Sequence, residues 1–486
     1  MPRPPRSLPA RLGLAVLLLT AAPTLSAQSA LTSADSALVG RILLAEDARD
    51  ARHPSFAEAL RHRDPRIQHL GVRARARITD PIFARRDSLQ LPAPVAPPVY
   101  PEVAWRLRYR ALTAQRSNCD ALLRALADSA WPVRLRAMDL MGAPCTADAR
   151  IVPALQAVIA ATPAVSQGRI PGGVSWHGGA HALVALARID TAAAAPHIVR
   201  LATHPQPEMR AYVVRAAALL ANIALLEQLA TDQDANVQSA AIDALRPLPR
   251  TAERETLLLA RLEQSAPQVV RSAAIALSGS NSPLVRKRAN AMYRRWSTFR
   301  NASYRDVRVA LLAAAGRDTA SDPPLPVHVA LPPRAVALAL GADVRVSVTM
   351  SAESGGGTFV VRMRGDVAPM MAATVVELAE QRYYDGLTWH RVEHDFVIQG
   401  GSPGANEYVG WHHFLRDALG SVPHVRGTVG MSTRGHDTGD AQWFVNVRDN
   451  LRLNRDYTVF AEVIEGIEVV DGILEGDRIE SMRVLR

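Results

Sequence analysis

The sequence predicts a multidomain protein in which an all-α repeat domain precedes a mainly-β C-terminal domain. Three observations lead to this prediction. At 486 residues the chain is too long for one compact core. An Ala-rich pattern of apolar residues recurs up to about residue 316. Segments rich in β-branched residues appear only after a Pro-rich stretch that follows this pattern.

The first 27 residues have the pattern of a secretory signal peptide. Arg3, Arg6 and Arg11 form a basic start, Leu12–Ala22 is an apolar run, and small residues follow it. The run is shorter than the ~18 apolar residues that a membrane helix needs, and no other stretch approaches that length. We therefore expect residues 1–27 to be cleaved and the mature protein to be exported, periplasmic or secreted, without a membrane span.

A weak repeat predicts that residues 28–316 form an α-helical repeat domain. Each copy has an apolar residue, usually followed by Arg or Gln, and another apolar residue five positions after the first. Val237–Ile242 and Val270–Ile275 differ at one position in six. The copies begin at Ile67, Val133, Met209, Val237, Val270 and Val307.

The later copies lie 28, 33 and 37 residues apart, a spacing typical of stacked helical hairpins. The pattern resembles HEAT repeats, which implies an all-α solenoid that serves as a protein-interaction platform for an unknown protein partner. An Ala-rich helical bundle of another kind remains the alternative.

The pattern changes after residue 316. Residues 317–342 are rich in proline and are predicted to form a linker, and the second domain is placed at 343–486. Strands are predicted at Val344–Met350 and Thr358–Met363. Helices are predicted at Pro369–Gln381 and Ile467–Leu474.

The net charge of +10 alone would suggest nucleic-acid binding, but the distribution of the basic residues argues against it. Lys287 is the only lysine, and arginine is spread over the whole chain instead of forming a basic stripe beside aromatic residues. We therefore expect no nucleic-acid partner.

Neither cysteines nor histidines have the spacing of a metal site. Cys119 and Cys145 are not in a CxxC pair, and in an oxidising compartment we predict a disulfide between them, with two buried thiols as the alternative. His177 and His181 stand four apart beside a Gly-rich segment, 168–179, that is predicted to be a loop. No third ligand is near, so no metal site is predicted.

Three blocks of residues in the second domain resemble, in order and spacing, the cyclophilin-type peptidyl-prolyl cis–trans isomerases. The blocks are Tyr383–Val392 with Phe396–Gly401, Gly427–Met431 with Gln442–Val445, and Leu453–Phe460. The resemblance covers nearly the whole family domain. It implies a closed antiparallel barrel capped by two helices, which acts without a cofactor on X–Pro bonds of proline-containing polypeptides.

The chemistry of this reaction explains why an arginine is needed. An X–Pro bond isomerises slowly because amide resonance is lost, with a barrier of ~18–20 kcal/mol. The resemblance implies that Arg391 donates to the peptide carbonyl and to the proline nitrogen as resonance is lost, which stabilises the twisted amide. An arginine in an apolar strand is also costly unless it faces a cleft or a partner.

The resemblance implies that Phe396 and Gln399 join Arg391 as catalytic residues, with Gln399 bonding to the substrate backbone. For Phe396, Phe444 and Leu453 the alternative is ordinary barrel core. The residues predicted to bind substrate are Val397, Ser432, Thr433, Arg434, Gln442, Phe444, Leu453 and Tyr457.

One block departs from the family. Ser432-Thr433-Arg434 stands where the family has Ala-Asn-Ala, and we expect the Arg434 guanidinium to narrow the subsite and to favour acidic or polar substrate residues over basic ones. The predicted function is a folding catalyst that isomerises X–Pro bonds of exported proteins. The alternative, favoured by this departure, is a catalytically weak peptide-binding module in a scaffold protein.

Overall fold

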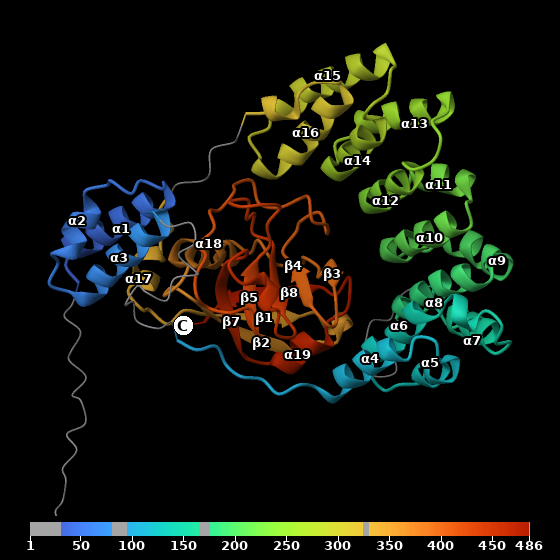
Figure 1. Cartoon of the computed structure of the whole chain (residues 1–486), viewed down its shortest axis with the longest axis horizontal. Helices are drawn as coiled ribbons and strands as arrows, with labels where there is room; N and C mark the ends of the chain where they lie inside the picture. The colour runs from blue at the N-terminus through green and yellow to red at the C-terminus, as the bar shows by residue number, and fades with distance from the viewer. Residues whose placement is uncertain (1–30, 80–94, 165–174, 324–329, 486) are drawn as a thin grey trace, which may run out of the picture.

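The computed structural model describes residues 31–79, 95–164, 175–323 and 330–485, which contain nineteen α-helices and eight strands. Figure 1 shows a curled sheet at the centre, a three-helix unit on one side and an arc of helices, α4–α16, on the other. The predicted signal peptide, 1–27, lies outside the described residues. In the part of the chain that the structure describes, no helix is long and apolar enough to cross a membrane.

The arc consists of two layers of helices (Figure 1). The even-numbered helices pack one on the next and form the inner layer, which faces the sheet, and the odd-numbered helices cover them on the outside. The bounds are α4 Ala104–Ala114, α5 Cys119–Ala125, α6 Trp131–Leu140, α7 Ile151–Ala160, α8 Trp176–Ile189, α9 Thr191–Leu201, α10 Pro207–Leu219, α11 Ile223–Leu229, α12 Ala235–Leu245, α13 Ala252–Leu262, α14 Pro267–Leu277, α15 Pro283–Ser297 and α16 Arg305–Ala314. We call α4–α16 the helical array.

The repeat motif falls at the start of inner helices. Its first apolar residue is at most 2% exposed in α6, α10, α12, α14 and α16. In α10 and α16 the arginine that follows it forms an ion pair with a later segment of the chain. Arg210 lies 2.7 Å from Asp232, and Arg308 lies 3.0 Å from Asp322. The membership of these repeats in the HEAT class stays a prediction.

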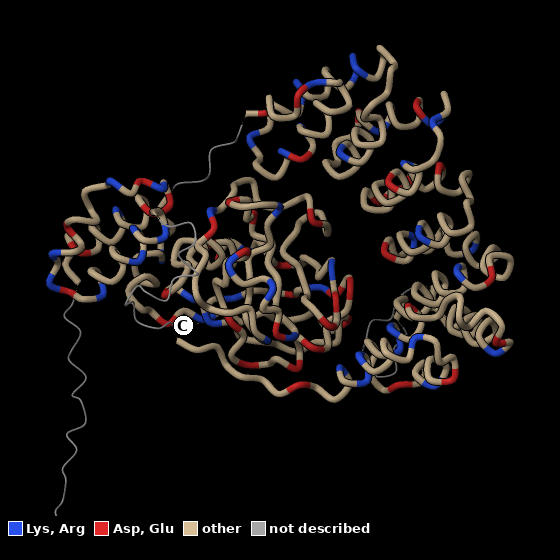
Figure 2. The backbone as a smooth tube through the Cα atoms, in the orientation of Figure 1, with Lys and Arg blue, Asp and Glu red and all other residues tan. Residues whose placement is uncertain are grey.

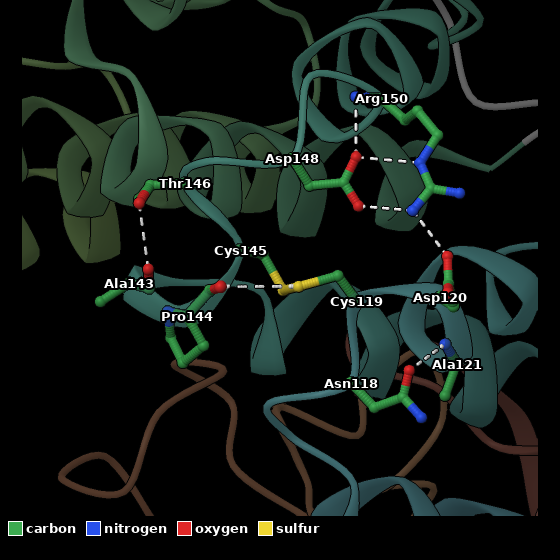
Figure 3. The surroundings of a disulfide bond; sticks show 10 residues. All are labelled: Asn118, Cys119, Asp120, Ala121, Ala143, Pro144, Cys145, Thr146, Asp148 and Arg150. Atoms are coloured by element: carbon green, nitrogen blue, oxygen red, sulfur yellow. Dashed lines mark hydrogen bonds and ion pairs between the residues drawn. A yellow bond between two sulfur atoms is a disulfide. The ribbon is translucent and has the colours of Figure 1, made fainter.

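The predicted disulfide is confirmed. Cys119 begins α5 and Cys145 ends a short 3-10 helix, Ala143–Cys145, and their sulfur atoms are bonded (Figure 3). Neither residue is a free thiol. The bond joins the first hairpin of the array to the segment before α7.

The predicted Gly-rich loop is wrong at its C-terminal end, because α8 already begins at Trp176. A Cβ atom on Gly179 would lie 1.7 Å from the Thr162 side chain. Glycine at this position therefore allows α7 and α8 to pack closely, and sequence alone gives no sign of that approach. Residues 165–174 of the predicted loop lie outside the described residues.

The second domain contains one eight-stranded antiparallel sheet in the order β3-β4-β6-β5-β7-β2-β1-β8. The two predicted strands and two predicted helices are confirmed as β1, β2, α18 and α19. The bounds are β1 Arg345–Met350, β2 Thr358–Met363, β3 Arg391–Val392, β4 Val397–Gly400, β5 Thr428–Met431, β6 Trp443–Asn446, β7 Val459–Glu465, β8 Ile479–Val484, α18 Pro369–Glu380 and α19 Ile467–Gly472.

The predicted closed barrel is wrong: the sheet is an open, curled half-barrel. Its edge strands β3 and β8 form no ladder with each other. The physical reason is the shortness of β3, which has two residues. The gap is spanned by single bridges in which Thr388 pairs with Ser402 and with Arg478.

The three-helix unit shares a hydrophobic core with the sheet. Its helices are α1 Ser33–Asp47, α2 Ser55–Leu60 and α3 Pro65–Thr79, and they belong to one buried cluster with α18 and α17 Ala335–Ala339, which lies within the Pro-rich segment 317–342. Arg77 of α3 donates to the carbonyl oxygens of Val367 and Leu419 at 2.9 and 3.1 Å. The helical array has a separate core, to which Leu474 of the second domain also belongs.

Candidate active site

Four neighbouring strands bring the predicted residues into one row. Arg391 on β3 is paired with Gln399 on β4, Gln399 with Phe444 on β6, and Phe444 with Gly430 on β5. Residues paired across antiparallel strands project from the same face of the sheet. The register therefore places Arg391, Gln399 and Phe444 side by side.

This row opens into a pocket of about 210 Å³. All the predicted catalytic and substrate-binding residues line it except Gln442, and Glu407, which the sequence did not indicate, lines it as well. The lining residues are Arg391, Phe396, Val397, Gln399, Glu407, Ser432, Thr433, Arg434, Phe444, Leu453 and Tyr457.

The floor of the pocket is an apolar cluster of Val397, Phe444 and Leu453, with Phe396 and Tyr457 packed against it. This cluster is separate from the main core of the sheet, so these side chains are not ordinary barrel core. A Cβ atom at Gly430 would lie 2.3 Å from the Phe444 ring. Glycine on β5 therefore lets that ring approach the strand closely.

Arg391 lies at the edge of the apolar floor, and its side chain is 40% exposed. Its guanidinium forms ion pairs of 3.0 Å with Glu393 and 3.1 Å with Glu407. An arginine in this strand was predicted to face a cleft or a partner, and it does both. Glu407 was missed because a single acidic residue in a loop without a motif gives no signal.

Comparison with known proteins agrees with this geometry. The family model described as cyclophilin type peptidyl-prolyl cis-trans isomerase/CLD matches residues 346–486. A peptidyl-prolyl cis-trans isomerase of Helicobacter pylori (strain ATCC 700392 / 26695) is 38% identical over 119 residues, which are 24% of this chain and 73% of the relative. The chain belongs to the cyclophilin family.

Two further relatives match the same share of this chain. Peptidyl-prolyl cis-trans isomerase B of Bacillus subtilis (strain 168) is 35% identical over 121 residues, 24% of this chain and 85% of the relative. Peptidyl-prolyl cis-trans isomerase B of Escherichia coli (strain K12) is 33% identical over 128 residues, 24% of this chain and 78% of the relative. All these matches fall short of the whole chain, and the family model begins after the last helix of the array.

Gln442 lies behind the wall of the cyclophilin pocket and is 1% exposed. Its carbonyl oxygen accepts from Gln399 Nε2 at 3.4 Å, and its own Nε2 donates to the carbonyls of Glu407 and Val409 at 3.3 Å. Gln442 therefore holds Gln399 and the Glu407 loop in place and does not face the pocket.

Arg434 lines the pocket, but its charge is already compensated. Its Nε lies 2.7 Å from an Asp306 carboxylate oxygen, and its Nη2 lies 3.0 Å from Asp440. Only 19% of the side chain is exposed. We therefore do not expect the intact chain to show the preference for acidic residues that a free guanidinium would give.

The helical array fixes the loop that carries Glu407. Asn236 of α12 donates to the Gly404 carbonyl at 2.9 Å and accepts from Asn406 at 3.0 Å. Arg271 of α14 lies 3.8 Å above the Tyr408 ring, a cation–π contact. One wall of the cyclophilin pocket is thus held by helices that precede the domain in the sequence.

Two histidines beside the site are neutral at physiological pH. Burial lowers the pKa of His390 to about 4. Burial also lowers the pKa of His424, whose ring lies between the Tyr457 carbonyl and the Asn446 amide at 3.1 Å from each. Neither ring supplies a charge near neutral pH, so the cations that line the pocket are the guanidinium groups of Arg391 and Arg434.

Proposed function

We propose that the cyclophilin domain isomerises X–Pro bonds of exported polypeptides and that the helical array is a platform for a protein partner or client. The observation that carries this proposal is the row of Arg391, Gln399 and Phe444 beside an apolar cluster that is separate from the core. Such a pocket combines a permanent cation with a surface for a proline ring.

The residues have distinct roles in this proposal. The proline ring packs on Val397, Phe444 and Leu453. Arg391 donates to the peptide carbonyl and, as the amide twists, to the nitrogen that regains its lone pair. Because this interaction is stronger in the twisted state than in the planar one, it lowers the barrier. Gln399 presents its carbonyl oxygen to a substrate backbone N–H, since its amide nitrogen donates to Gln442.

The ion pairs of Arg391 with Glu393 and Glu407 orient the guanidinium before substrate binds. All three side chains are substantially exposed, so each pair stabilises the folded state by only ~0.2–1 kcal/mol. A substrate carbonyl can therefore replace one of them at small cost.

Export and the platform role rest on other observations. Residues 1–27 have the signal-peptide pattern, and a disulfide such as Cys119–Cys145 is typical of an oxidising compartment. The inner layer of the array faces the cyclophilin domain and contacts the loop at its pocket. This arrangement suits a client bound by both parts at once.

A second candidate is a catalytically weak peptide-binding module in a scaffold protein. It is favoured by Ser432-Thr433-Arg434, which replaces the family's Ala-Asn-Ala, and by the two carboxylates that already hold Arg391. In this candidate the pocket binds proline peptides without accelerating their isomerisation.

A protease-coupled assay on a proline tetrapeptide separates the two candidates. The enzyme proposal predicts that Arg391→Ala lowers kcat/KM by about 10²-fold, as expected for the loss of a transition-state donor. Arg345→Ala, an exposed arginine of β1 outside the pocket, is the matched control and should retain full activity. Peptide binding without acceleration in wild type, or unchanged turnover in folded Arg391→Ala, would contradict the enzyme proposal.

A further inference from the structure

A second cavity, of about 380 Å³, lies between the helical array and the cyclophilin domain. Residues of α4, α6, α8 and α10 form one wall, and His390–His394 with Glu475 form the other. Arg391 lines both this cavity and the substrate pocket. The two cavities therefore meet at one guanidinium, and the second is within the size range of ligand sites.

Three arginines of the array line this cavity: Arg136 on α6, Arg188 on α8 and Arg215 on α10. Arg136 donates to the Thr113 hydroxyl at 3.0 Å, Arg188 donates to a backbone carbonyl at 3.0 Å, and Arg215 stacks on Tyr212 at 4.2 Å. Among the residues that the structure describes, no carboxylate lies within 4.0 Å of any of these guanidinium groups.

The acidic residues of the cavity already have other partners. Asp139 lies 2.7 Å from His181, Glu475 accepts from the Tyr212 hydroxyl at 2.9 Å, and Glu393 pairs with Arg391. Three guanidinium groups thus line the cavity without a direct ion pair, and Glu475 and Asp139 act on Arg215 only at longer range. Guanidinium binds carboxylates through paired, charge-assisted hydrogen bonds, so a ligand carboxylate suits these three groups.

The neighbouring cavity has the opposite charge. It measures about 310 Å³ and shares His390 and Glu475 with the first. Glu208 and Asp234 of the α10–α12 region add two further acids, against one arginine, Arg478. The groove between array and cyclophilin domain is therefore basic along α6, α8 and α10 and acidic beyond. An acidic ligand segment is attracted to one end only.

We propose that the Arg136–Arg188–Arg215 cavity binds acidic side chains of the same polypeptide whose proline lies in the substrate pocket. This inference rests on the proposed function, since it takes the ligand to be a proline-containing polypeptide. An extended chain advances ~3.3 Å per residue. Because Arg391 lines both cavities, a few residues beyond the proline can carry the chain from the substrate pocket into the second cavity. The array then selects clients by the charge that flanks their proline.

The test uses proline peptides that carry three Glu, three Gln or three Lys residues on either side of a common Ala-Pro core. Titration calorimetry on the whole chain measures their affinity. We expect the Glu tail, on one of the two sides, to bind about three- to tenfold more tightly than the Gln tail, the range for two or three exposed ion pairs. Lys tails should bind more weakly than Gln tails, and added salt should reduce both differences.

Variants locate the effect. Arg188→Gln with Arg215→Gln should remove most of the difference between Glu and Gln tails. The control pair, Arg124→Gln with Arg246→Gln, makes the same change in charge at exposed positions outside the cavity and should keep it. Equal affinities of Glu and Gln tails in wild type, or a Glu preference that survives the cavity variants, would overturn the proposal.

Two further arms identify the ligand. Free glutarate is added until its carboxylate concentration equals that of the Glu-tailed peptide, and it should not displace the peptide. Displacement would show that the cavity binds small anions instead. The same peptides are also run in the isomerase assay. If none is isomerised, the proposed function fails, whereas the tail-dependent affinity still decides the proposal about the cavity, because binding needs no turnover.

Discussion

The carboxylate of Asp306, in the last helix of the array, lies 2.7 Å from the guanidinium of Arg434 in the cyclophilin pocket. Asp440 holds the other side of the same guanidinium at 3.0 Å. The array therefore sets the charge of a pocket wall, in addition to holding the Glu407 loop through Asn236 and Arg271.

Removing this carboxylate should create a substrate preference. In Asp306→Asn, Arg434 loses one of its two carboxylate partners. Peptides with Glu two positions before proline should therefore gain a few-fold in kcat/KM over Lys, in line with ~0.2–1 kcal/mol for an exposed pair. Wild type and the control Asp120→Asn, an exposed acid of α5, should show no such preference. A peptide series with Glu, Ala and Lys at that position measures it. Equal efficiencies in Asp306→Asn would place Arg434 away from the substrate.

The proposed role of Arg391 makes Glu407 a competitor of the substrate carbonyl for its guanidinium. Glu407→Gln should lower KM for a proline tetrapeptide by about two- to fivefold, because one exposed ion pair of ~0.2–1 kcal/mol no longer has to break. The value of kcat should change little. Glu380→Gln, an exposed acid of α18 that pairs with Arg334, is the control. A raised KM would show instead that the orienting effect of Glu407 on the guanidinium outweighs its competition with the substrate.

The buried His390 should make stability fall at acidic pH. Its folded-state pKa of about 4 lies below the unfolded value of ~6.5, so the unfolded chain takes up the proton first. Above pH 6.5 the ring is neutral in both states, so His390 does not lower the free energy of unfolding. As the pH falls from 6.5 to 4, protonation of the unfolded chain lowers the free energy of unfolding by about 3 kcal/mol in total, at ~1.4 kcal/mol per pH unit. Urea unfolding between pH 7 and 4.5 should show a shallower loss in His390→Gln than in wild type. The exposed His69→Gln should follow wild type.

The disulfide should stabilise the first hairpin of the array. It spans 26 residues of sequence, for which chain entropy predicts about 3 kcal/mol. Cys119→Ala with Cys145→Ala should lower the Tm and raise hydrogen exchange in α5–α7, while turnover of a tetrapeptide stays unchanged. If hydrogen exchange and Tm equal those of the oxidised wild type, the packing of the helices alone holds this hairpin, and the disulfide adds no stability.

Local pattern predicted much of this structure. Alternation of β-branched residues gave β2 its bounds, Thr358–Met363, and motif spacing brought Arg391, Gln399 and Phe444 together, because strand register follows from sequence order within one domain. The repeat motif marked inner helices because its apolar residue must be buried between the layers.

Contacts between distant segments could not be predicted. Glu407, Asp306 and Asn236 act at the pocket through partners in other parts of the chain, and no periodicity records such pairs. The helix through Gly179 depends on Thr162 of the preceding segment. The open edge of the sheet depends on the length of β3, which strand propensity does not determine.

The shared core of the three-helix unit and the sheet has a consequence for the order of folding. Leu38, Ile42 and Ile67 precede the array in the sequence, yet their partners in α18 and the sheet are synthesised only after the entire array. Closing so long a loop is slow, and the array can fold by local contacts meanwhile. The helices α1–α3 thus keep an apolar face exposed until the sheet has been synthesised. The isolated residues 343–486 would leave the matching face bare, as an aggregation-prone surface.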